Sequence, residues 1–190
     1  SLRADNFSME LMQRLQRGRK AGLTFAPEAG TQRLRDAINK NVTEDELTES
    51  LKTAFSGGWN AVKLYFMLGL PTETDEDVLG IAEMAKHAVH TWREYASNKN
   101  RGLRVTVSTS WFVPKPFTAF QWEAQIPRAE YERRVRLLRE AITAKAVTYN
   151  WHDGDTSFLE AVLARGDRRL GRVLERAFRK GAKLDAWSDC

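Results

Sequence analysis

Residues 59–68 read Trp59-Asn60-Ala61-Val62-Lys63-Leu64-Tyr65-Phe66-Met67-Leu68, and Gly69-Leu70-Pro71 follows them. This nearly continuous apolar run is typical of a strand of a parallel sheet that is covered on both faces. We therefore expect a buried strand here, with the Gly-Leu-Pro sequence breaking it at its carboxyl end.

Strand and helix signals alternate on both sides of this run. Short strands are predicted over residues 22–26, 103–110 and 146–151. Thr43 and Glu46 form a capping box that predicts the start of a helix, which Gly57-Gly58 would end. Apolar residues at helical spacing predict the other helices, over residues 8–20, 31–40, 74–96 and 129–145, with two basic helices after residue 151.

The order of these elements predicts the fold class. Repeated β-α units favour an α/β fold whose parallel strands are joined by right-handed crossovers. Repeats of roughly forty residues suit part of a TIM-type (β/α) barrel better than a Rossmann sheet, because no GxGxxG motif follows a strand. A doubly wound sheet is the alternative.

Composition excludes several classes of protein. The chain has 190 residues, 42% of them hydrophobic, which is enough for a sizeable core. Its mean hydropathy is -0.51, and neither a membrane-spanning run nor a signal peptide is found, so we expect a cytoplasmic protein with no membrane partner. The single cysteine, Cys190, excludes an internal disulfide and a cluster of sulfur ligands for a metal. A net charge of +5 permits an acidic partner without requiring nucleic acid.

The carboxyl ends of parallel strands are where ligands bind in such folds, so the segments that follow the predicted strands are the candidate site. Glu28 can accept hydrogen bonds from an amine or from ribose hydroxyls, or it can stabilise the start of the next helix. Gly69 allows a positive φ or the close approach of a ligand, or simply a turn. Glu73 is equally placed to favour a helix start. Arg33 and Lys40 can bind a carboxylate or phosphate, or remain solvated charges.

Three further groups of residues could have a functional role, but each also has a simpler structural explanation. His87 and His90 have a metal-like spacing, but a helix surface is the simpler home for them. His152 and Asp153 form either an acid–base pair or an ordinary turn. The basic residues of 165–180 either contact RNA phosphates or form a charged face.

Several of these segments resemble motifs of radical S-adenosylmethionine (SAM) enzymes. Residues 65–73 resemble the fifth-strand motif GxIxGxxxE, in which Gly69 and Glu73 match while Tyr65 and Met67 replace glycine and isoleucine. Residues 27–34 resemble the fourth-strand QSGSxRxL segment of methylthiotransferase-type members. The remaining similar segments are residues 39–43 (NRxYT in those members), 112–118 (the sixth-strand exit), 151–153 and 163–169. Over essentially its whole length the chain is similar to Fe–S oxidoreductases that carry an N-terminal cobalamin-binding-like domain.

This resemblance implies the C-terminal half of a (β/α)6 barrel in residues 1–127, holding strands four to six, and a helical extension in residues 128–190. The CxxxCxxC loop that holds the [4Fe–4S] cluster is absent from the sequence, as are the first three strands. The resemblance therefore implies a piece of an enzyme that cleaves SAM reductively to a 5′-deoxyadenosyl radical, inactive alone. Its partners would be the missing N-terminal half, an unknown substrate and, for the isolated piece, a second copy. Use of cobalamin stays open.

Roles for single residues follow from the matching positions. The resemblance implies that the backbone at Met67 and Gly69 lies against adenine, and that Val113 and Pro114 close the other side. Glu28 and Arg33 would hold the ribose or the methionine end of SAM. The same resemblance implies a polar contact with SAM from Thr31, a supporting role in the turn for Glu73, and, for Lys40, the place of an arginine in relatives.

Two other functions are compatible with the sequence. The first is a basic RNA-binding or scaffold module built on a degenerate half barrel. The second is an unrelated phosphate-binding β/α enzyme, which is the weakest reading because the sequence has no glycine-rich phosphate loop.

Overall fold

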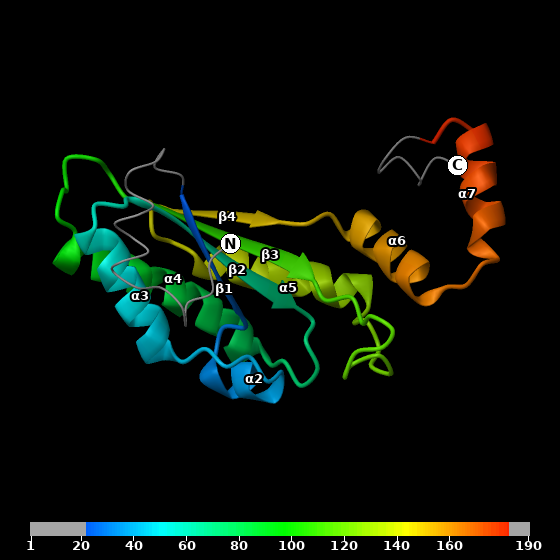
Figure 1. Ribbon diagram of the computed structural model, residues 1–190, viewed down its shortest axis with the longest axis horizontal. Helices are drawn as coiled ribbons and strands as arrows, with labels where there is room; N and C mark the ends of the chain where they lie inside the picture. The colour runs from blue at the N-terminus through cyan, green and yellow to red at the C-terminus, as the bar shows by residue number, and fades with distance from the viewer. Residues whose placement is uncertain (1–21, 183–190) are drawn as a thin grey trace.

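The computed structural model describes residues 22–182, so the predicted helix over residues 8–20, the start of the predicted barrel half and Cys190 lie outside the described part. The described chain is an α/β fold with a four-stranded sheet and six helices (Figure 1). In chain order the elements are β1 (Leu23–Glu28), α2 (Gln32–Ala37), α3 (Glu44–Ser56), β2 (Ala61–Leu68), α4 (Asp75–Tyr95), β3 (Arg104–Trp111), α5 (Arg128–Ala141), β4 (Val147–Trp151), α6 (Gly154–Arg165) and α7 (Leu170–Arg179).

All neighbouring strands of the sheet are parallel, as the sequence predicts. The strand order is β1-β2-β3-β4, so each strand pairs with the one that follows it in the chain. The register aligns Leu23 with Val62, Val62 with Val105, and Val105 with Val147. A doubly wound sheet reverses its strand order at a switch point. The described strands contain no such reversal.

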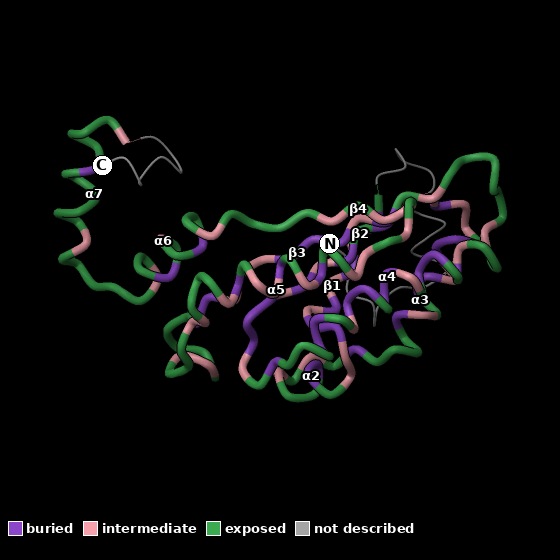
Figure 2. Tube along the Cα trace, turned by 180° about the vertical axis from the view of Figure 1, so that it is seen from behind, coloured by how far each residue is buried: buried purple, intermediate pink, exposed green. Residues whose placement is uncertain are grey.

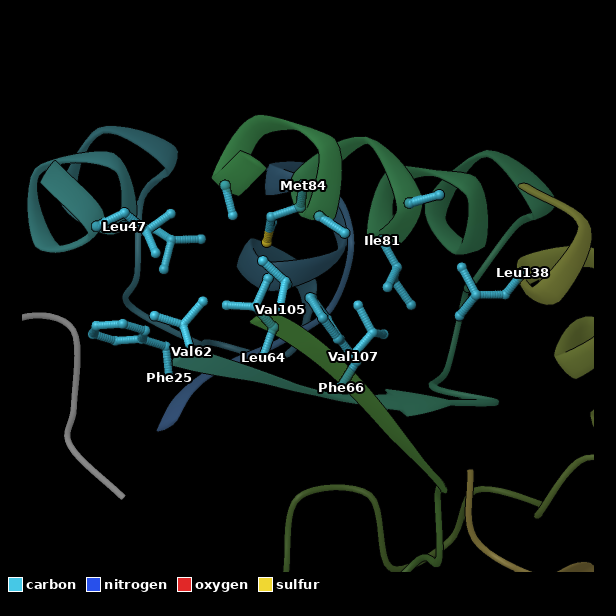
Figure 3. Close-up of a cluster of buried hydrophobic side chains, with 14 of the residues drawn as sticks. Phe25, Leu47, Val62, Leu64, Phe66, Ile81, Met84, Val105, Val107 and Leu138 are labelled. Atoms are coloured by element: carbon cyan, nitrogen blue, oxygen red, sulfur yellow. The ribbon is translucent and has the colours of Figure 1, made fainter. Parts of the chain in front are cut away.

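Helices α3, α4 and α5 cover one face of the sheet, and the hydrophobic core lies between them and the strands. Figure 3 shows Val62, Leu64 and Phe66 of β2 pointing toward the helices, where they face Ile81 and Met84 of α4. Alternate residues of a strand point to opposite faces, so this face takes every second strand residue. Among the described residues, the helices therefore pack on one side of the sheet.

One sequence expectation about β2 is wrong. The run was predicted to be covered on both faces, but burial alternates along β2: Val62, Leu64, Phe66 and Leu68 are buried, whereas Lys63 is exposed. Tyr65 and Met67, on the same side as Lys63, are only partly buried. We call this second side the open face of the sheet. The β2 residues on this face are apolar or amphipathic, so in sequence β2 resembles a strand that is buried on both faces. No described helix covers this face.

The C-terminal part, residues 128–190, contains the strand predicted over residues 146–151 as well as helices. This strand, β4, joins the same sheet beside β3, and α5 packs on the core through Tyr131, Val135 and Leu138. We call residues 22–151 the sheet unit and residues 152–182, with α6 and α7, the arm. Figure 2 shows that buried residues concentrate in the sheet unit and that most of the arm is exposed.

Local signals in the sequence set the helix starts. The predicted capping box is confirmed: the Glu46 backbone N–H donates to Thr43 Oγ1 at 3.2 Å, and the Thr43 N–H donates to the Glu46 carboxylate at 2.8 Å. Thr74 precedes α4 as predicted. Across residues 22–182, none of the helices has the combination of length and apolar character that crossing a membrane requires.

Candidate functional site at the carboxyl edge of the sheet

The loops that follow β1, β2 and β3 meet at the carboxyl edge, because these strands are adjacent and parallel. Positive φ angles gather in these loops: Glu28 has a φ of 70°, Gly69 of 86°, Thr72 of 66° and Phe117 of 61°. Residues other than glycine rarely adopt this conformation, and such strain persists only where the surrounding structure holds it. The backbone of this edge is therefore held in place by specific contacts.

Glu28 and Lys40 form a partly buried ion pair at the end of β1. Lys40 Nζ donates to Glu28 Oε1 at 3.3 Å, and the side chains are 28% and 21% exposed, respectively. Lys40 follows α2, so the pair joins the strand end to the far end of that helix. The structure thus brings together two residues that the sequence analysis treated as separate candidates.

The Asp77 carboxylate is the central hydrogen-bond acceptor at the carboxyl edge of the sheet. The sequence analysis did not identify it. The carboxylate accepts hydrogen bonds from the Thr31 hydroxyl, from Arg33, and from the Thr74 N–H at 2.7 Å. Burial alone would raise the pKa of Asp77, but the hydrogen bonds from Thr31, Thr74 and Arg33 outweigh it and hold the pKa below its usual value. Thr31 and Arg33, both predicted ligand residues, are therefore fixed by a carboxylate at the start of α4.

Arg33 keeps part of its guanidinium accessible. It also donates to the Thr72 carbonyl at 3.0 Å, and its side chain remains 53% exposed. Guanidinium groups carry five N–H donors, so the two contacts leave donors for a further acceptor. The pairing with Asp77 fixes where those donors point.

Two glycines let α2 approach α4 at this point. A Cβ on Gly30 would lie 2.1 Å from the Asp77 carbonyl oxygen, and one on Gly80 would lie 2.7 Å from the Gly30 carbonyl oxygen. Both distances are far inside van der Waals contact with backbone atoms. Only glycine fits at either position without a backbone shift, and this approach brings Thr31 within reach of Asp77.

The turn after β2 is closed by Glu73, as the resemblance implies. The Gly69 N–H donates to Glu73 Oε2 at 2.7 Å, and Arg134 of α5 donates to the same oxygen. Burial raises the pKa of Glu73 to about 7, although the bonds from Gly69 and Arg134 act in the opposite direction. Glu73 is 8% exposed, so its position favours support of the turn over contact with a ligand.

Arg134 extends this contact into a network on the surface of α5. The Arg134 Nε donates to Glu130 Oε1 at 2.8 Å. Arg133 donates both to Glu130 and to Asp75, the latter at 2.6 Å. Hydrogen bonds from Arg133 and Arg134 lower the pKa of Glu130 to about 2. The network ties α5 to the turn that begins α4.

The predicted apolar residues line the same edge. Met67 packs with Phe112 against a small buried cluster of Ala29, Leu34 and Leu70, while Val113 and Pro114 are buried. Ile126 lies over Gly69, since a Cβ there would come within 2.8 Å of its side chain. Ile126 therefore covers one side of the strand end at Gly69.

Arg35 is a second residue that the sequence analysis missed. It is 1% exposed, and its guanidinium donates to the carbonyls of Ala29 and Val42 at 3.1 and 3.0 Å. Gln32 and Glu44 accept its remaining bonds at 3.1 and 3.3 Å. By donating hydrogen bonds to two loop carbonyls, the buried Arg35 guanidinium holds the backbone next to Glu28 in place.

Two predicted groups do not form the sites considered for them. Asp153 caps α6, accepting from the Thr156 N–H at 3.0 Å, so it is not paired with His152. His87 lies 2.9 Å from Thr48 Oγ1 of α3, as expected for a histidine on a helix surface. Within residues 22–182 no group of three potential metal ligands is found.

Comparison with known proteins gives one relative, which is similar to this chain over part of its own length. The chain is 31% identical over 175 residues to the uncharacterized protein MJ0966 of Methanocaldococcus jannaschii. The matched region covers 92% of this chain and 36% of that protein, so the chain spans little more than a third of its relative. No protein-family model matches the chain, and no solved structure matches it.

Proposed function

We propose that this chain is the C-terminal part of a (β/α) barrel of the radical SAM type and that its carboxyl edge contributes to the binding of SAM. Two features of the fold support the barrel. The strands follow one another in sequential order, and the described helices of the sheet unit lie on one face of the sheet. A closed barrel has its helices outside and its ligand at the carboxyl ends of the strands.

The observation that carries the proposal is the position of Glu28. It ends β1 with a φ of 70° and accepts a hydrogen bond from Lys40, while Arg33, with a side chain that is 53% exposed, lies in α2, the helix that follows β1. A carboxylate accepts hydrogen bonds from vicinal hydroxyls such as those of a ribose, and cationic groups bind an amino-acid carboxylate. This group of charges suits the two polar ends of SAM, and the apolar cluster with Met67 suits a purine between them.

The cluster that radical SAM chemistry uses does not fit the residues of this chain. A [4Fe–4S] cluster of that type takes three thiolates, and the sequence has one cysteine, Cys190. When bound, SAM supplies the sulfonium bond that such chemistry cleaves. Residues of this chain hold and orient it: Glu28 and Lys40 at the end of β1, Arg33 as Asp77 positions it, and the β2 turn that Glu73 closes.

The remaining parts of the proposal follow from the resemblance. The missing strands, the cluster and any cobalamin would come from a longer polypeptide, consistent with a relative of which this chain covers 36%. The substrate of the whole protein stays open. The open face of the sheet would then form part of the barrel interior.

The test is titration of the chain with SAM by calorimetry or by NMR chemical shifts. We expect Glu28→Gln, which keeps the shape of the side chain but removes its charge, to weaken binding about tenfold, since hydrogen bonds to charged groups are the stronger ones. Glu76→Gln is the matched control, because Glu76 is an exposed carboxylate in the first turn of α4. Equal affinity of wild type and Glu28→Gln, or no binding, would contradict the proposal.

A further inference from the structure

Helix α7 has an apolar side and a basic side. The apolar side consists of Leu170, Val173, Leu174, Ala177 and Phe178, at positions that share one face of a helix. Arg172, Arg176 and Arg179 lie on the opposite side. Such separation is the pattern of a helix that packs one side against a partner.

Within the described residues, the sheet unit does not cover this apolar side. Phe178 is 81% exposed, Val173 49% and Leu174 45%. Figures 1 and 2 both show α7 at one end of the molecule, beyond α6 and away from the sheet. The ion pair of α7 between Arg179 and Glu175, at 2.5 Å, stays within the helix. Three large apolar side chains are thus presented on a helix that is displaced from its own core.

The groove that matches this helix lies between α3 and α4. It encloses a cavity of about 490 Å³. Leu47 of α3 and Met84 of α4, both buried in the core, form its apolar lining. Three carboxylates line it as well: Glu44, Asp45 and Glu83, of which Glu44 and Glu83 have side chains that are 67% and 69% exposed. The groove therefore combines an apolar floor with a negative rim.

We propose that α7 of one chain docks in the α3–α4 groove of a second copy of this chain. The apolar side of α7 would enter the groove and pack on its floor at Leu47 and Met84, while its arginines would face the three carboxylates. An amphipathic helix laid into an apolar groove is a common mode of recognition, and opposite charges at the rim add specificity. The groove borders the carboxyl edge through Gly30 and Thr31, but the inference rests on α7 and on the carboxylates of α3 and α4 and does not depend on SAM binding.

The occupant is a second copy because the chain cannot fill its own groove in this conformation. Figures 1 and 2 place α3 and α7 at opposite ends of the molecule. An RNA or an anionic membrane would also attract the arginines, but neither would explain the acidic groove on the same chain. A contact between two different surfaces is heterologous, so two copies can exchange arms reciprocally or can extend into a longer assembly.

The experiment is sedimentation velocity of the 190-residue chain over a concentration series. We expect association that Phe178→Asp and Glu83→Arg each weaken by about tenfold or more, since each removes a central contact of the docked helix. The matched controls are Phe117→Asp and Glu140→Arg. Phe117 is 97% exposed in the loop after β3, and Glu140 is exposed on α5, so each control makes the same change at another surface.

Mixing the two variants gives the decisive result. The Phe178→Asp chain keeps an intact groove, and the Glu83→Arg chain keeps an intact arm, so we expect the mixture to form a one-to-one complex at concentrations at which each variant alone is monomeric. A wild-type chain that stays monomeric throughout the series would overturn the proposal. So would association that neither variant weakens, or a mixture that forms no complex.

A second pair of measurements separates the other partners. Binding of the wild-type chain to RNA, or to vesicles of phosphatidylcholine and phosphatidylserine, is compared with that of Phe178→Asp and Glu83→Arg. If Phe178→Asp abolishes binding to one of them while Glu83→Arg leaves both that binding and self-association unchanged, α7 serves that partner and the proposal fails.

Discussion

Phe25, Phe55 and Phe66 of the sheet unit are fully buried, whereas Phe158 and Phe178 of the arm are 59% and 81% exposed. Both regions contain amphipathic helices, so local sequence pattern alone does not separate them. The difference is the presence of the sheet, which supplies an apolar surface for α3, α4 and α5 (Figure 3). Helices as short as α7 are marginal in isolation and gain most of their stability from packing. The arm is therefore the part of the described chain that has the least packing to stabilise it.

The largest expected difference in stability is between replacing a phenylalanine of the sheet unit and replacing one of the arm. Phe66→Ala should lower the free energy of unfolding by about 3–5 kcal/mol, because it leaves a cavity in a close-packed core. Phe178→Ala should change it by less than about 0.5 kcal/mol in the monomer. Urea unfolding at low protein concentration measures both. A large loss from Phe178→Ala would show that α7 packs on the sheet unit and would contradict the distinction between the two regions.

The buried carboxyl of Glu73 makes the stability of the sheet unit dependent on pH. Its folded pKa is raised to about 7, above the value of about 4.3 in an unfolded chain. The folded chain thus keeps a proton that the unfolded chain loses, so stability falls as pH rises from about 4.3 to about 7. Each pKa unit corresponds to about 1.4 kcal/mol, so the difference of about 2.7 between the two pKa values gives a total of about 4 kcal/mol.

Glu73→Gln tests this pH dependence. The amide cannot ionise, so the variant should lose the fall in stability over this pH range while the wild type retains it. Thermal unfolding from pH 5 to pH 8 measures the difference. Glu76→Gln, at an exposed carboxylate on the same helix, should behave like the wild type. Parallel pH profiles for wild type and Glu73→Gln would mean that Glu73 stays ionised beside Arg134.

The contact between α2 and α4 predicts a smaller loss. Gly30→Ala places a Cβ against the Asp77 carbonyl oxygen, and the backbone must shift, which should cost about 2 kcal/mol. Gly102→Ala is the control, because a Cβ there meets nothing within 4 Å. If Gly30→Ala also weakens SAM binding, the effect runs through Thr31 and Arg33. A neutral Gly30→Ala would mean that the two helices separate easily.

The smallest effect compares one helix cap in each region. Thr43→Ala removes the capping box of α3 and should lower the free energy of unfolding by about 1 kcal/mol. Asp153→Ala removes the cap of α6 but should change global stability by less than about 0.5 kcal/mol, with a local loss of hydrogen-exchange protection in the arm. Equal global effects would show that α6 unfolds together with the sheet unit.

The sequence was most informative where local rules decide the structure. Thr43 with Glu46, and the run ending at Gly69, predicted a helix start and a strand end that the structure confirms. The parallel arrangement followed from the repeated units. Asp77 and Arg35 were missed because their roles depend on partners brought near by folding, such as Thr31 and Val42. The position of Asp77, three residues after Thr74, predicts a capping box at the start of a helix, but it does not predict the contacts with Thr31 and Arg33.

The one-sided cover of β2 could not be predicted for a related reason. Tyr65 and Met67 are large enough to look like core residues, and a pattern records the type of residue rather than what lies opposite it. The displaced position of α7 was also beyond reach, since its sequence is that of an ordinary packed helix. In both cases the sequence pattern does not say whether another element packs against the apolar side.

The sequential strand order has a consequence for how the chain folds during synthesis. Partners such as Leu23 and Val62, or Val105 and Val147, are only about 40 residues apart. Each new strand finds the edge of the preceding one already made, so the sheet can grow in the order in which the ribosome releases it. Among the four described strands, each one therefore pairs with its predecessor without waiting for a partner that is distant in the sequence. Pausing after residue 151 would let the sheet unit form before the arm is made.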